Sequence, residues 1–446
     1  MLKNHFRETI NLAVPVVIGQ VGITLMGIVD SAMVGRVGAA SLAAASISGG
    51  FFFIITVVGL GIISSITPLV AIAVGSFNDA APGKLFKQGF WVTVITSAIL
   101  NLIVYFGAEV IHYMDQPPDV AELAISYTRI ISFSILPMLL FICYKQFIEG
   151  LSFTRPAMVI ALAANLVNFF FNWILIYGNL GAPSLGLDGA GVATLLSRIF
   201  MFVSLAYFVH RSTKFSRFGL KILPYGGPDE HGREILRLGL PSGFQSFFEV
   251  GFFALSAFMV GWIGKNSLAS HQIAMNVAST TYLVCLGIST AGTIRVGNAL
   301  GAGNISEVKR AGSVAIYLGV GFMLLSGILL VIFKSVIPLL YTNEPKVLEI
   351  ASTLLTIAAL FQVFDGSQAV ALGVLRGIKE VKIPTVITFI AYWLIGLPAA
   401  LLLGFVLNLG TKGIWFGMSI SLIASSVMLN SRFFLKIRKL RLPAAP

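Results

Sequence analysis

Runs of apolar residues, each long enough to cross a lipid bilayer, follow one another along nearly the whole chain. A transmembrane α-helix needs about 20 apolar residues, and backbone polar groups in lipid must be satisfied within the segment itself. The chain is therefore predicted to be an all-α polytopic membrane protein with twelve transmembrane helices. The predicted spans are 10–35, 46–75, 89–112, 123–149, 156–178, 189–210, 238–263, 268–298, 312–337, 347–375, 384–407 and 413–434.

Composition agrees with this prediction. Of the 446 residues, 57% are hydrophobic and only 11% are charged, whereas charged residues make up about 25% of a soluble domain. The net charge of +12 does not indicate a nucleic-acid partner. The basic residues flank the apolar runs and do not form one patch with aromatic residues between them. We therefore expect a lipid bilayer as the surroundings, and no nucleic acid.

The distribution of Lys and Arg predicts the orientation. An even number of spans places both termini on one side of the membrane, and the connections on that side hold most of the Lys and Arg. Positively charged connections remain in the cytoplasm. Both termini are therefore predicted to be cytoplasmic.

The two halves of the chain resemble each other. MVGRVGAASLAAASI (33–47) matches MVGWIGKNSLASHQI (259–273) at an offset of 226 residues. Parallel repeats of this kind build transporters that bind substrate between two lobes. Pro15 and Pro241, early in the first span of each half, are candidate kink sites. The predicted domains are an N-terminal lobe (1–210), a cytoplasmic linker (211–235), a C-terminal lobe (236–434) and a basic cytoplasmic tail (435–446).

Three acidic residues lie well inside predicted spans: Asp30, Glu249 and Asp365. Each would cost about 2.5–3.5 kcal/mol at a lipid-facing helix centre, so we expect each to face the interior. No span offers an obvious basic partner at matching depth, which leaves a proton or a bound cation. At the repeat offset Asp30 corresponds to Ser256, and Glu249 to Ile23. The acids are therefore not inherited from the repeat, and each lobe is predicted to have its own acidic site.

Polar residues at helical spacing accompany these acids. Side-chain oxygens on converging helices suit Na+, a desolvated carboxylate suits H+, and amides alone can hold helices together by hydrogen bonds. The sequence leaves these alternatives open. The accompanying residues are Gln245 beside Glu249, Gln362 and Gln368 around Asp365, and Asn165, Asn168 and Asn172 in span five.

Other chemistry is not indicated. The chain shows no nucleophile–base or metalloprotease spacing and no Gly-Lys-Thr phosphate loop, so we expect neither an enzyme nor a cofactor. Glu149 is expected to form an ion pair beside Arg155 at the membrane interface. His271 is expected to serve packing or a hydrogen bond.

Several motifs together resemble a known family. They are VDSAMVGRVG (29–38), NWILIYG (172–178), PSGFQSFFEV (241–250), IRVGNALGAG (294–303) and FDGSQAVALGVLRGIKE (364–380). This combination is similar to the multidrug and toxic compound extrusion (MATE) transporters, within them to the NorM branch. The resemblance implies two six-helix lobes around a central V-shaped cleft. It also implies export of cationic lipophilic drugs, dyes and toxins against Na+ or H+ across a bacterial inner membrane.

The resemblance also assigns roles to residues. The acids of the branch in helices one, seven and ten match Asp30, Glu249 and Asp365, and a Na+ site, if present, would lie at the last two. Asn168 and Asn172 match the asparagines of the NW motif. Phe361 stands where several relatives carry tyrosine, so a part of the cation site is altered here.

Alternatives remain within the same architecture. A flippase for lipid-linked sugars would hold pyrophosphate with several cationic residues, whereas this interior is acidic. Export of a dedicated metabolite is a further alternative. The coupling ion, the native substrate and the stoichiometry stay open, and a monomer is expected.

Overall fold

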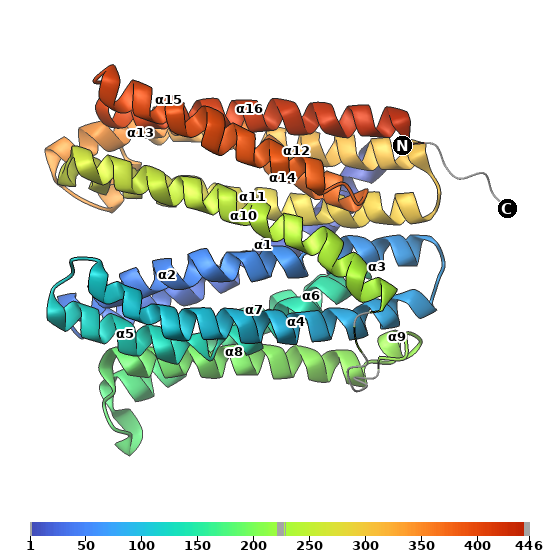
Figure 1. Cartoon of the computed structure of the whole chain (residues 1–446), viewed down its shortest axis with the longest axis horizontal. Helices are drawn as coiled ribbons and strands as arrows, with labels where there is room; N and C mark the ends of the chain where they lie inside the picture. The colour runs from blue at the N-terminus through green and yellow to red at the C-terminus, as the bar shows by residue number, and fades with distance from the viewer. Residues whose placement is uncertain (1, 221–226, 228, 441–446) are drawn as a thin grey trace. The chain divides into compact units, whose positions relative to one another are not determined.

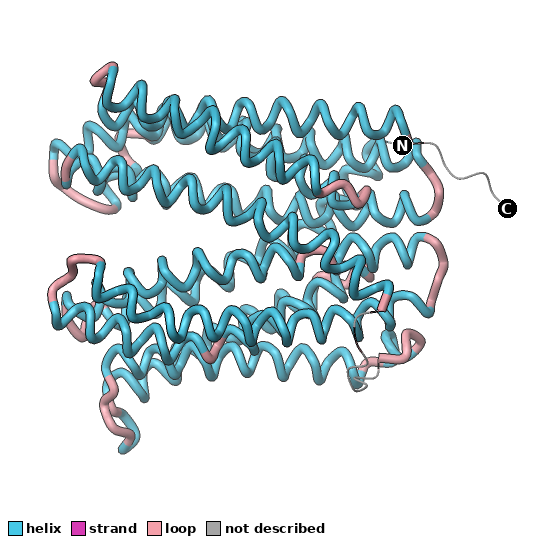
Figure 2. Tube along the Cα trace, viewed as in Figure 1, coloured by secondary structure: helices cyan, strands magenta, loops and turns pink. Residues whose placement is uncertain are grey.

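The computed structural model describes residues 2–220, 227 and 229–440, and within these ranges the chain is helical, without strands (Figures 1 and 2). The first half contains α1 (Leu2–Val34), α2 (Ala39–Ile63), α3 (Ile66–Gly75), α4 (Ala80–Gly107), η1 (Ala108–Tyr113), α5 (Pro118–Ser132), α6 (Ile135–Gly150), α7 (Arg155–Tyr177), η2 (Asn179–Gly181), α8 (Gly186–Arg211) and α9 (Thr213–Ser216). The second half contains α10 (Glu230–Ile263), α11 (Lys265–Gly301), α12 (Ile305–Phe333), η3 (Ile337–Leu340), α13 (Pro345–Gly377), α14 (Lys382–Phe389), η4 (Ile390–Gly396), α15 (Leu397–Leu401), η5 (Leu402–Val406) and α16 (Gly410–Lys439).

Membrane-spanning helices account for nearly all of this structure. Eleven helical segments of the described residues are long and apolar enough to cross a bilayer. The pair α5 and α6, bent by 43° at its break, makes a twelfth if it is one span. The predicted all-α membrane fold is confirmed.

Several helices extend beyond their apolar runs. α1 begins at Leu2 and α10 at Glu230, eight residues before each predicted span, and α16 continues to Lys439. The added turns are amphipathic: Thr9, Ile235 and Ile437 are buried, so packing favours the helix where hydropathy alone does not. Residues 435–439 of the predicted tail continue α16, and residues 441–446 lie outside the described residues. In the predicted linker, residues 221–226 and 228 also lie outside them.

Packing divides the chain into two compact units. The first unit comprises Ile18–Gly243, and the second comprises Met1–Val17 with Phe244–Pro446. One border therefore falls inside α1 and the other inside α10. The predicted lobes, in contrast, are divided at the linker 211–235. The two borders are 226 residues apart, the offset of the internal repeat. We call residues 2–17 the α1 arm and residues 230–243 the α10 arm.

Close glycine contacts hold each arm in its unit. In the first unit, a Cβ on Gly61 of α2 would lie 2.6 Å from Gly243 Cα of the α10 arm. In the second unit, a Cβ on Gly287 of α11 would lie 2.3 Å from Val17 Cγ2 of the α1 arm. These two contacts are equivalent at the repeat offset, because Gly61 matches Gly287 and Val17 matches Gly243. Both repeats therefore use a glycine to admit an arm at close range.

The second unit places polar residues from several helices beside a packed core. α11 and α13 are neighbours along much of their length, and α13 also packs on α12 and α16. Phe361, Trp415 and Leu422 lie in one buried cluster. A π-helical segment, η4, interrupts the span that begins with α14. Such segments re-aim side chains and are frequent at functional sites, and here η4 carries Tyr392.

Candidate cation and substrate sites

Gln368 of α13 connects the two acids of the second unit. Its Nε2 lies 3.0 Å from Glu249 Oε1 of α10, 3.3 Å from Asp365 Oδ1 and 2.7 Å from the Tyr392 hydroxyl. Ser425 of α16 donates to the Gln368 Oε1 at 2.6 Å. The structure therefore brings together Glu249, Asp365 and Gln368, as the sequence predicts, and we call these three with Tyr282, Tyr392 and Ser425 the Gln368 cluster.

The hydrogen bonds of this cluster do not satisfy its acids. A carboxamide has two N–H groups, and the Gln368 amide shares them among three acceptors. Asp365 accepts no other bond from the described residues, and Glu249 adds only the Tyr282 hydroxyl at 3.4 Å. Gln368 and Tyr392 are fully buried, and Asp365 is 8% exposed. Two poorly satisfied carboxylates in such a place need a proton or a cation.

A basic residue adjoins this cluster, contrary to the sequence expectation. Arg376, in the last turn of α13, interacts electrostatically with Glu249 and approaches Gln245 Oε1 at 3.5 Å. The sequence analysis expected no basic residue near these acids, because Arg376 lies just after the predicted span 347–375 and was placed at the membrane surface. In the structure Arg376 still belongs to α13. No Lys or Arg of the described residues lies within ion-pair distance of Glu249 or Asp365, so the acids are not locked. Together, the two acids and Arg376 carry a formal charge of −1.

Gln362 and Phe361 lie outside the Gln368 cluster. Gln362 donates to Thr281 Oγ1 at 2.7 Å, and within the described chain its Oε1 has no hydrogen-bond partner. Phe361 packs on Trp415, with ring centroids 5.4 Å apart. Trp415 in turn donates to His271 Nδ1 at 3.1 Å, which confirms a hydrogen-bonding role for His271. The polar stripe predicted on α13 is therefore divided between two neighbourhoods.

The acid of the first unit has different surroundings. Asn172 of α7 donates to Asp30 Oδ1 at 2.6 Å, and Thr194 of α8 donates to Asp30 Oδ2 at 2.9 Å. Asn172 also donates to Asn168 Oδ1 at 3.1 Å, and both asparagines are fully buried. Both carboxylate oxygens of Asp30 thus have a short hydrogen bond. We call Asp30, Asn168, Asn172 and Thr194 the Asp30 cluster.

A basic residue also adjoins the Asp30 cluster. Arg198 of α8 interacts electrostatically with Asp30. Its guanidinium donates to Ser134 at 2.6 Å and lies 5.0 Å from the Phe52 ring centroid. Asp30 and Arg198 have no formal net charge between them. The expectation that no span offers a basic partner is therefore wrong here too, because Arg198 lies in the middle of a predicted span.

Asn165 is separate from the Asp30 cluster. Its Nδ2 donates to the backbone carbonyls of Gly22 and Ala161, both at 2.9 Å. It therefore joins α7 to α1, as the helix-to-helix alternative for the asparagines predicts. The three asparagines of α7 thus divide between two roles.

Sequence reasoning did not find four residues of these clusters: Thr194, Tyr282, Tyr392 and Ser425. Hydroxyl groups inside a span carry little penalty and are common, so they do not stand out in an apolar run. Tyr392 had one usable signal, because a buried tyrosine hydroxyl usually has a polar partner. The others become visible only when the helices are placed side by side.

Glu149 forms an ion pair, as predicted. Its Oε1 lies 3.3 Å from Lys145 Nζ, one turn earlier in α6, and both side chains are buried. The partner is thus Lys145 and not the neighbouring Arg155. The helix places residues i and i+4 on one face, whereas Arg155 begins the next helix.

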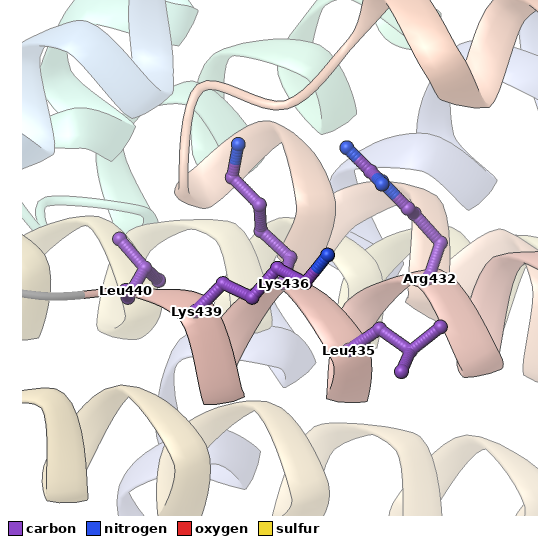
Figure 3. Close-up of a pocket in the computed structure, with 5 residues that line it drawn as sticks. All are labelled: Arg432, Leu435, Lys436, Lys439 and Leu440. Carbon is purple, nitrogen blue, oxygen red and sulfur yellow. The ribbon is translucent and has the colours of Figure 1, made fainter.

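The end of α16 forms a basic pocket of about 370 Å³, shown in Figure 3. Arg432, Leu435, Lys436, Lys439 and Leu440 line it. Arg432 and Lys436 also pair with Glu380, at 2.9 Å and 2.5 Å. Burial raises the pKa of Glu380, but the hydrogen bonds from Lys436 and Arg432 outweigh that effect and hold this pKa below its ordinary value. Glu380 therefore stays ionised and ties α16 to the connection after α13.

No group of three or more His, Cys, Asp or Glu side chains in the described part of the chain could hold a metal ion. Any Na+ would instead use the two acids of the Gln368 cluster with neutral oxygens. The residues of the cluster that offer such oxygens are Tyr282, Tyr392 and Ser425. Hard cations bind such mixed oxygen donors.

A family model described as MatE matches residues 15–174 and again residues 241–402. The chain therefore belongs to the MatE family, whose members are membrane transporters, not enzymes. The two matches begin 226 residues apart, in agreement with the internal repeat.

Curated relatives match nearly the whole length of the chain. A probable multidrug resistance protein NorM of Mesorhizobium japonicum is 36% identical over 98% of this chain and 95% of its own. A multidrug resistance protein MdtK of Yersinia pseudotuberculosis is 36% identical over 96% of this chain and 94% of its own. The likeness thus includes both units.

Solved structures share the fold. The eukaryotic MATE transporter AtDTX14 is 20% identical and superposes with a TM-score of 0.89, covering 98% of each chain. A MOP superfamily transporter from Pyrococcus furiosus is 21% identical, with a TM-score of 0.87 over 98% of this chain and 97% of its own. The binding pocket of that transporter has reverse polarity, which suggests a different function for it.

Proposed function

We propose that this protein exports cationic lipophilic compounds by antiport against Na+ or H+, with the Gln368 cluster as the coupling site. The names of the curated relatives support multidrug efflux. The observation that carries the proposal is the state of Glu249 and Asp365. They share one amide donor, they lie in a largely buried place, and no ion pair with a described Lys or Arg neutralises them.

The formal charge of the site indicates how coupling can work. Glu249, Asp365 and Arg376 sum to −1, so one Na+ or one H+ neutralises the group. A cationic drug competes for the same charge. Ion and drug therefore exclude each other, and each favours the conformation in which it binds more tightly.

The sequence of events follows from this competition. When the site opens to the outside, Na+ or H+ neutralises the acids and the drug leaves. When it opens to the cytoplasm, the ion departs and the bare carboxylates attract the next cationic drug. The repeat offers two similar halves for such alternation, as in other transporters with parallel repeats.

The orientation also belongs to this proposal. We place both termini in the cytoplasm and the protein in the bacterial inner membrane, because Lys and Arg gather on the terminal side. The lobes of 1–210 and 236–434 and a monomeric state are further parts of the proposal.

The rival function, a flippase for lipid-linked sugars, needs positive charge at the site. Arg376 and Arg198 are the basic residues that adjoin the two clusters, and each stands beside at least one acid. A diphosphate would therefore meet a net charge of −1 or 0. The residues favour a cationic cargo.

Proteoliposomes loaded with ethidium test the proposal. Ethidium movement is measured separately under a Na+ gradient and under a proton gradient, for the natural protein and for Asp365→Asn. We expect one of the two gradients to drive ethidium and the variant to lose that response. Ethidium movement that neither gradient accelerates would refute antiport, and a variant with full activity would remove the Gln368 cluster from the mechanism.

A further inference from the structure

The last turns of α16 carry several positive charges on one face. The residues that line the pocket of about 370 Å³ follow one another at helical spacing, so they share one side of α16. Three of them are basic, and no described acid lines the pocket with them. We call this surface the basic face of α16, and its residues are Arg432, Leu435, Lys436, Lys439 and Leu440.

The basic face lies where α16 leaves the hydrocarbon core of a bilayer. α16 is one of the helices that are long and apolar enough to cross a membrane. Residues 413–431 carry no charge, and Arg432 is the first charged residue after them. Since a hydrocarbon core takes about 20 residues of a helix, Arg432, Lys436 and Lys439 reach the level of the lipid headgroups. The basic face therefore meets phosphate groups in a phospholipid bilayer.

Glu380 fixes two of the three cations in place. Arg432 Nη2 lies 2.9 Å from Glu380 Oε1, and Lys436 Nζ lies 2.5 Å from Glu380 Oε2. Both basic side chains extend to the same side of α16 (Figure 3). A side chain that a neighbour already holds loses less conformational freedom when a ligand binds. Glu380 thus pre-organises the face for an anion, although it offsets one of the three charges.

The cations keep hydrogen-bond donors for a ligand. A guanidinium has five N–H groups, and among the described residues the guanidinium of Arg432 donates only to Glu380. Its buried Nε has no partner there. The exposed side chain of Lys439 has neither an ion pair nor a hydrogen bond within the same residues. With Glu380 included, the face has a formal charge of +2, and its free donors are of the kind that binds phosphate oxygens.

Two other cavities show that this charge is local. In the predicted topology all three lie on the side of the termini, where Lys and Arg gather in general. A cavity of about 510 Å³, lined by residues that include Glu8, Arg295 and Glu307, has a formal charge of −1. Another, of about 850 Å³, has a formal charge of 0. Its charged lining residues are Asp79, Lys84, Lys87, Arg217, Asp229 and Glu230. Orientation alone therefore does not explain the positive charge of the basic face.

An exposed leucine adjoins the cations. Leu435 is 51% exposed, although it lies one residue from Lys436 and one turn from Arg432. A free phosphate ion gains nothing from an apolar side chain, whereas a phospholipid brings an acyl chain next to its headgroup. The combination of Leu435 with three cations therefore suits an anionic amphiphile better than a free anion.

We propose that the basic face of α16 binds an anionic phospholipid, with the lipid phosphate among Arg432, Lys436 and Lys439 and an acyl chain along Leu435. Basic pockets at the headgroup level of spanning helices bind such lipids in other membrane proteins. The formal charge of +2 favours a headgroup with net negative charge over a zwitterionic one, whose ammonium group the same cations repel. Such a site needs only that α16 spans a membrane, and it is independent of the proposed antiport.

Lipid binding to the purified full chain, measured by native mass spectrometry, tests the inference. The three probes are phosphatidylglycerol, phosphatidylcholine with the same acyl chains, and inorganic phosphate. We expect phosphatidylglycerol to bind about tenfold or more tightly than phosphatidylcholine, because two net positive charges face it. Lys439→Gln should weaken phosphatidylglycerol binding about fivefold, as for loss of one basic residue beside an anionic headgroup. Thermal unfolding of Lys439→Gln should be unchanged, since Lys439 holds no described partner.

Arg438→Gln is the matched control. Arg438 is exposed in the same turn of α16 but does not line the pocket, so the variant removes one positive charge from the other side of the helix. We expect it to bind phosphatidylglycerol like the natural protein. Leu435→Asn should weaken phosphatidylglycerol binding, and excess inorganic phosphate should not displace the lipid.

Three results would overturn the inference. Equal weakening in Lys439→Gln and Arg438→Gln would mean that overall charge explains the binding. Equal affinity for phosphatidylcholine would mean that the cations do not select the headgroup. Displacement of phosphatidylglycerol by inorganic phosphate would mean that the basic face takes a free anion. Because transport is not measured, each of these results would leave the proposed antiport untouched.

Discussion

Asp30 in the first unit and Asp365 in the second are the same type of side chain in opposite situations. Asp30 accepts short hydrogen bonds on both oxygens, and Arg198 balances its charge. Asp365 accepts one long bond from an amide that also serves Glu249 and Tyr392. The first arrangement gives each carboxylate oxygen a hydrogen bond of its own. The second needs a positive guest, and this difference predicts where the coupling ion binds.

The repeat shows how this difference arose on one scaffold. The position that holds Asp30 in α1 holds Ser256 in α10, and the Ser256 hydroxyl donates to the carbonyl of Phe252 in its own helix. The position that holds Glu249 in α10 holds Ile23 in α1. A carboxylate at one depth in one repeat is thus matched by an apolar or self-satisfied residue in the other. The two clusters are separate additions to a shared helical frame.

The largest effect is expected for Glu249→Gln. The variant removes half of the acid pair and changes the formal charge of the site from −1 to 0. We expect ethidium efflux in proteoliposomes to fall about 100-fold, as for loss of a buried charge interaction of roughly 3 kcal/mol. Thermal unfolding should be unchanged, because glutamine can still accept from Gln368. Efflux within about threefold of the natural protein, well short of that loss, would contradict the proposed coupling.

A smaller effect is expected for Gln368→Leu. The variant deprives Glu249, Asp365 and the Tyr392 hydroxyl of their shared donor, and it leaves the Ser425 hydroxyl without its acceptor. Loss of these buried bonds should lower the free energy of unfolding by about 1–3 kcal/mol, with weaker coupling to the ion gradient. Gln362→Leu is the matched control, on the same helix and also buried, and it should leave coupling intact. Equal losses of coupling in both variants would show that the contacts of Gln368 with Glu249, Asp365 and Tyr392 have no special role in coupling.

Asp30→Asn should reduce efflux less than Glu249→Gln, by about tenfold or less. The amide can retain one of the two bonds, but Arg198 loses its counter-charge, so we expect destabilisation of about 1–2 kcal/mol. Unfolding of Asp30→Asn, Arg198→Gln and the double variant measures this coupling. We expect the double variant to be more stable than the sum of the single effects implies. Strict additivity, together with a loss of efflux as large as for Glu249→Gln, would reverse the roles of the two clusters.

The smallest effect concerns Glu380, outside both clusters. Because its pKa is lowered in the folded state, its contribution is present above the unfolded pKa of about 4.3 and is lost as pH falls through the folded value. Glu380→Gln should therefore lower the free energy of unfolding by about 0.5–1 kcal/mol at pH 7. At acidic pH, below the folded pKa, the two proteins should unfold alike. A difference that persists there would mean that packing, not charge, explains the effect.

The membrane fold could be predicted from the apolar runs. The two sites could be predicted only in part. A run of about 20 apolar residues has one solution in lipid, so the spans and their helical state follow directly. Asp30, Glu249 and Asp365 stand out because a charge in a span is costly. The partners Thr194, Tyr392 and Ser425 do not stand out, since a hydroxyl in a helix can bond to its own backbone. Arg198 and Arg376 show a further limit: hydropathy places a residue along a span but does not say which helix it faces.

The arms show a similar limit at the scale of the fold. Pro15 and Pro241 mark the repeat in the sequence, and each lies two residues before a border between the packed units. The sequence does not indicate that an arm packs with the other half of the chain. The contacts of Gly61 and Gly287 with the two arms show this exchange.

Equilibrium binding of ethidium to the purified protein tests the central claim most directly. Fluorescence anisotropy gives the apparent Kd for ethidium as Na+ is raised at fixed pH, and as pH is lowered without Na+. We predict that one of these cations raises the apparent Kd linearly with its concentration, as expected when one monovalent ion and the drug compete for a site of charge −1. The dependence should disappear in Glu249→Gln and remain in Asp30→Asn. An ethidium affinity that neither Na+ nor H+ alters, or one that follows Asp30 and not Glu249, would contradict the claim.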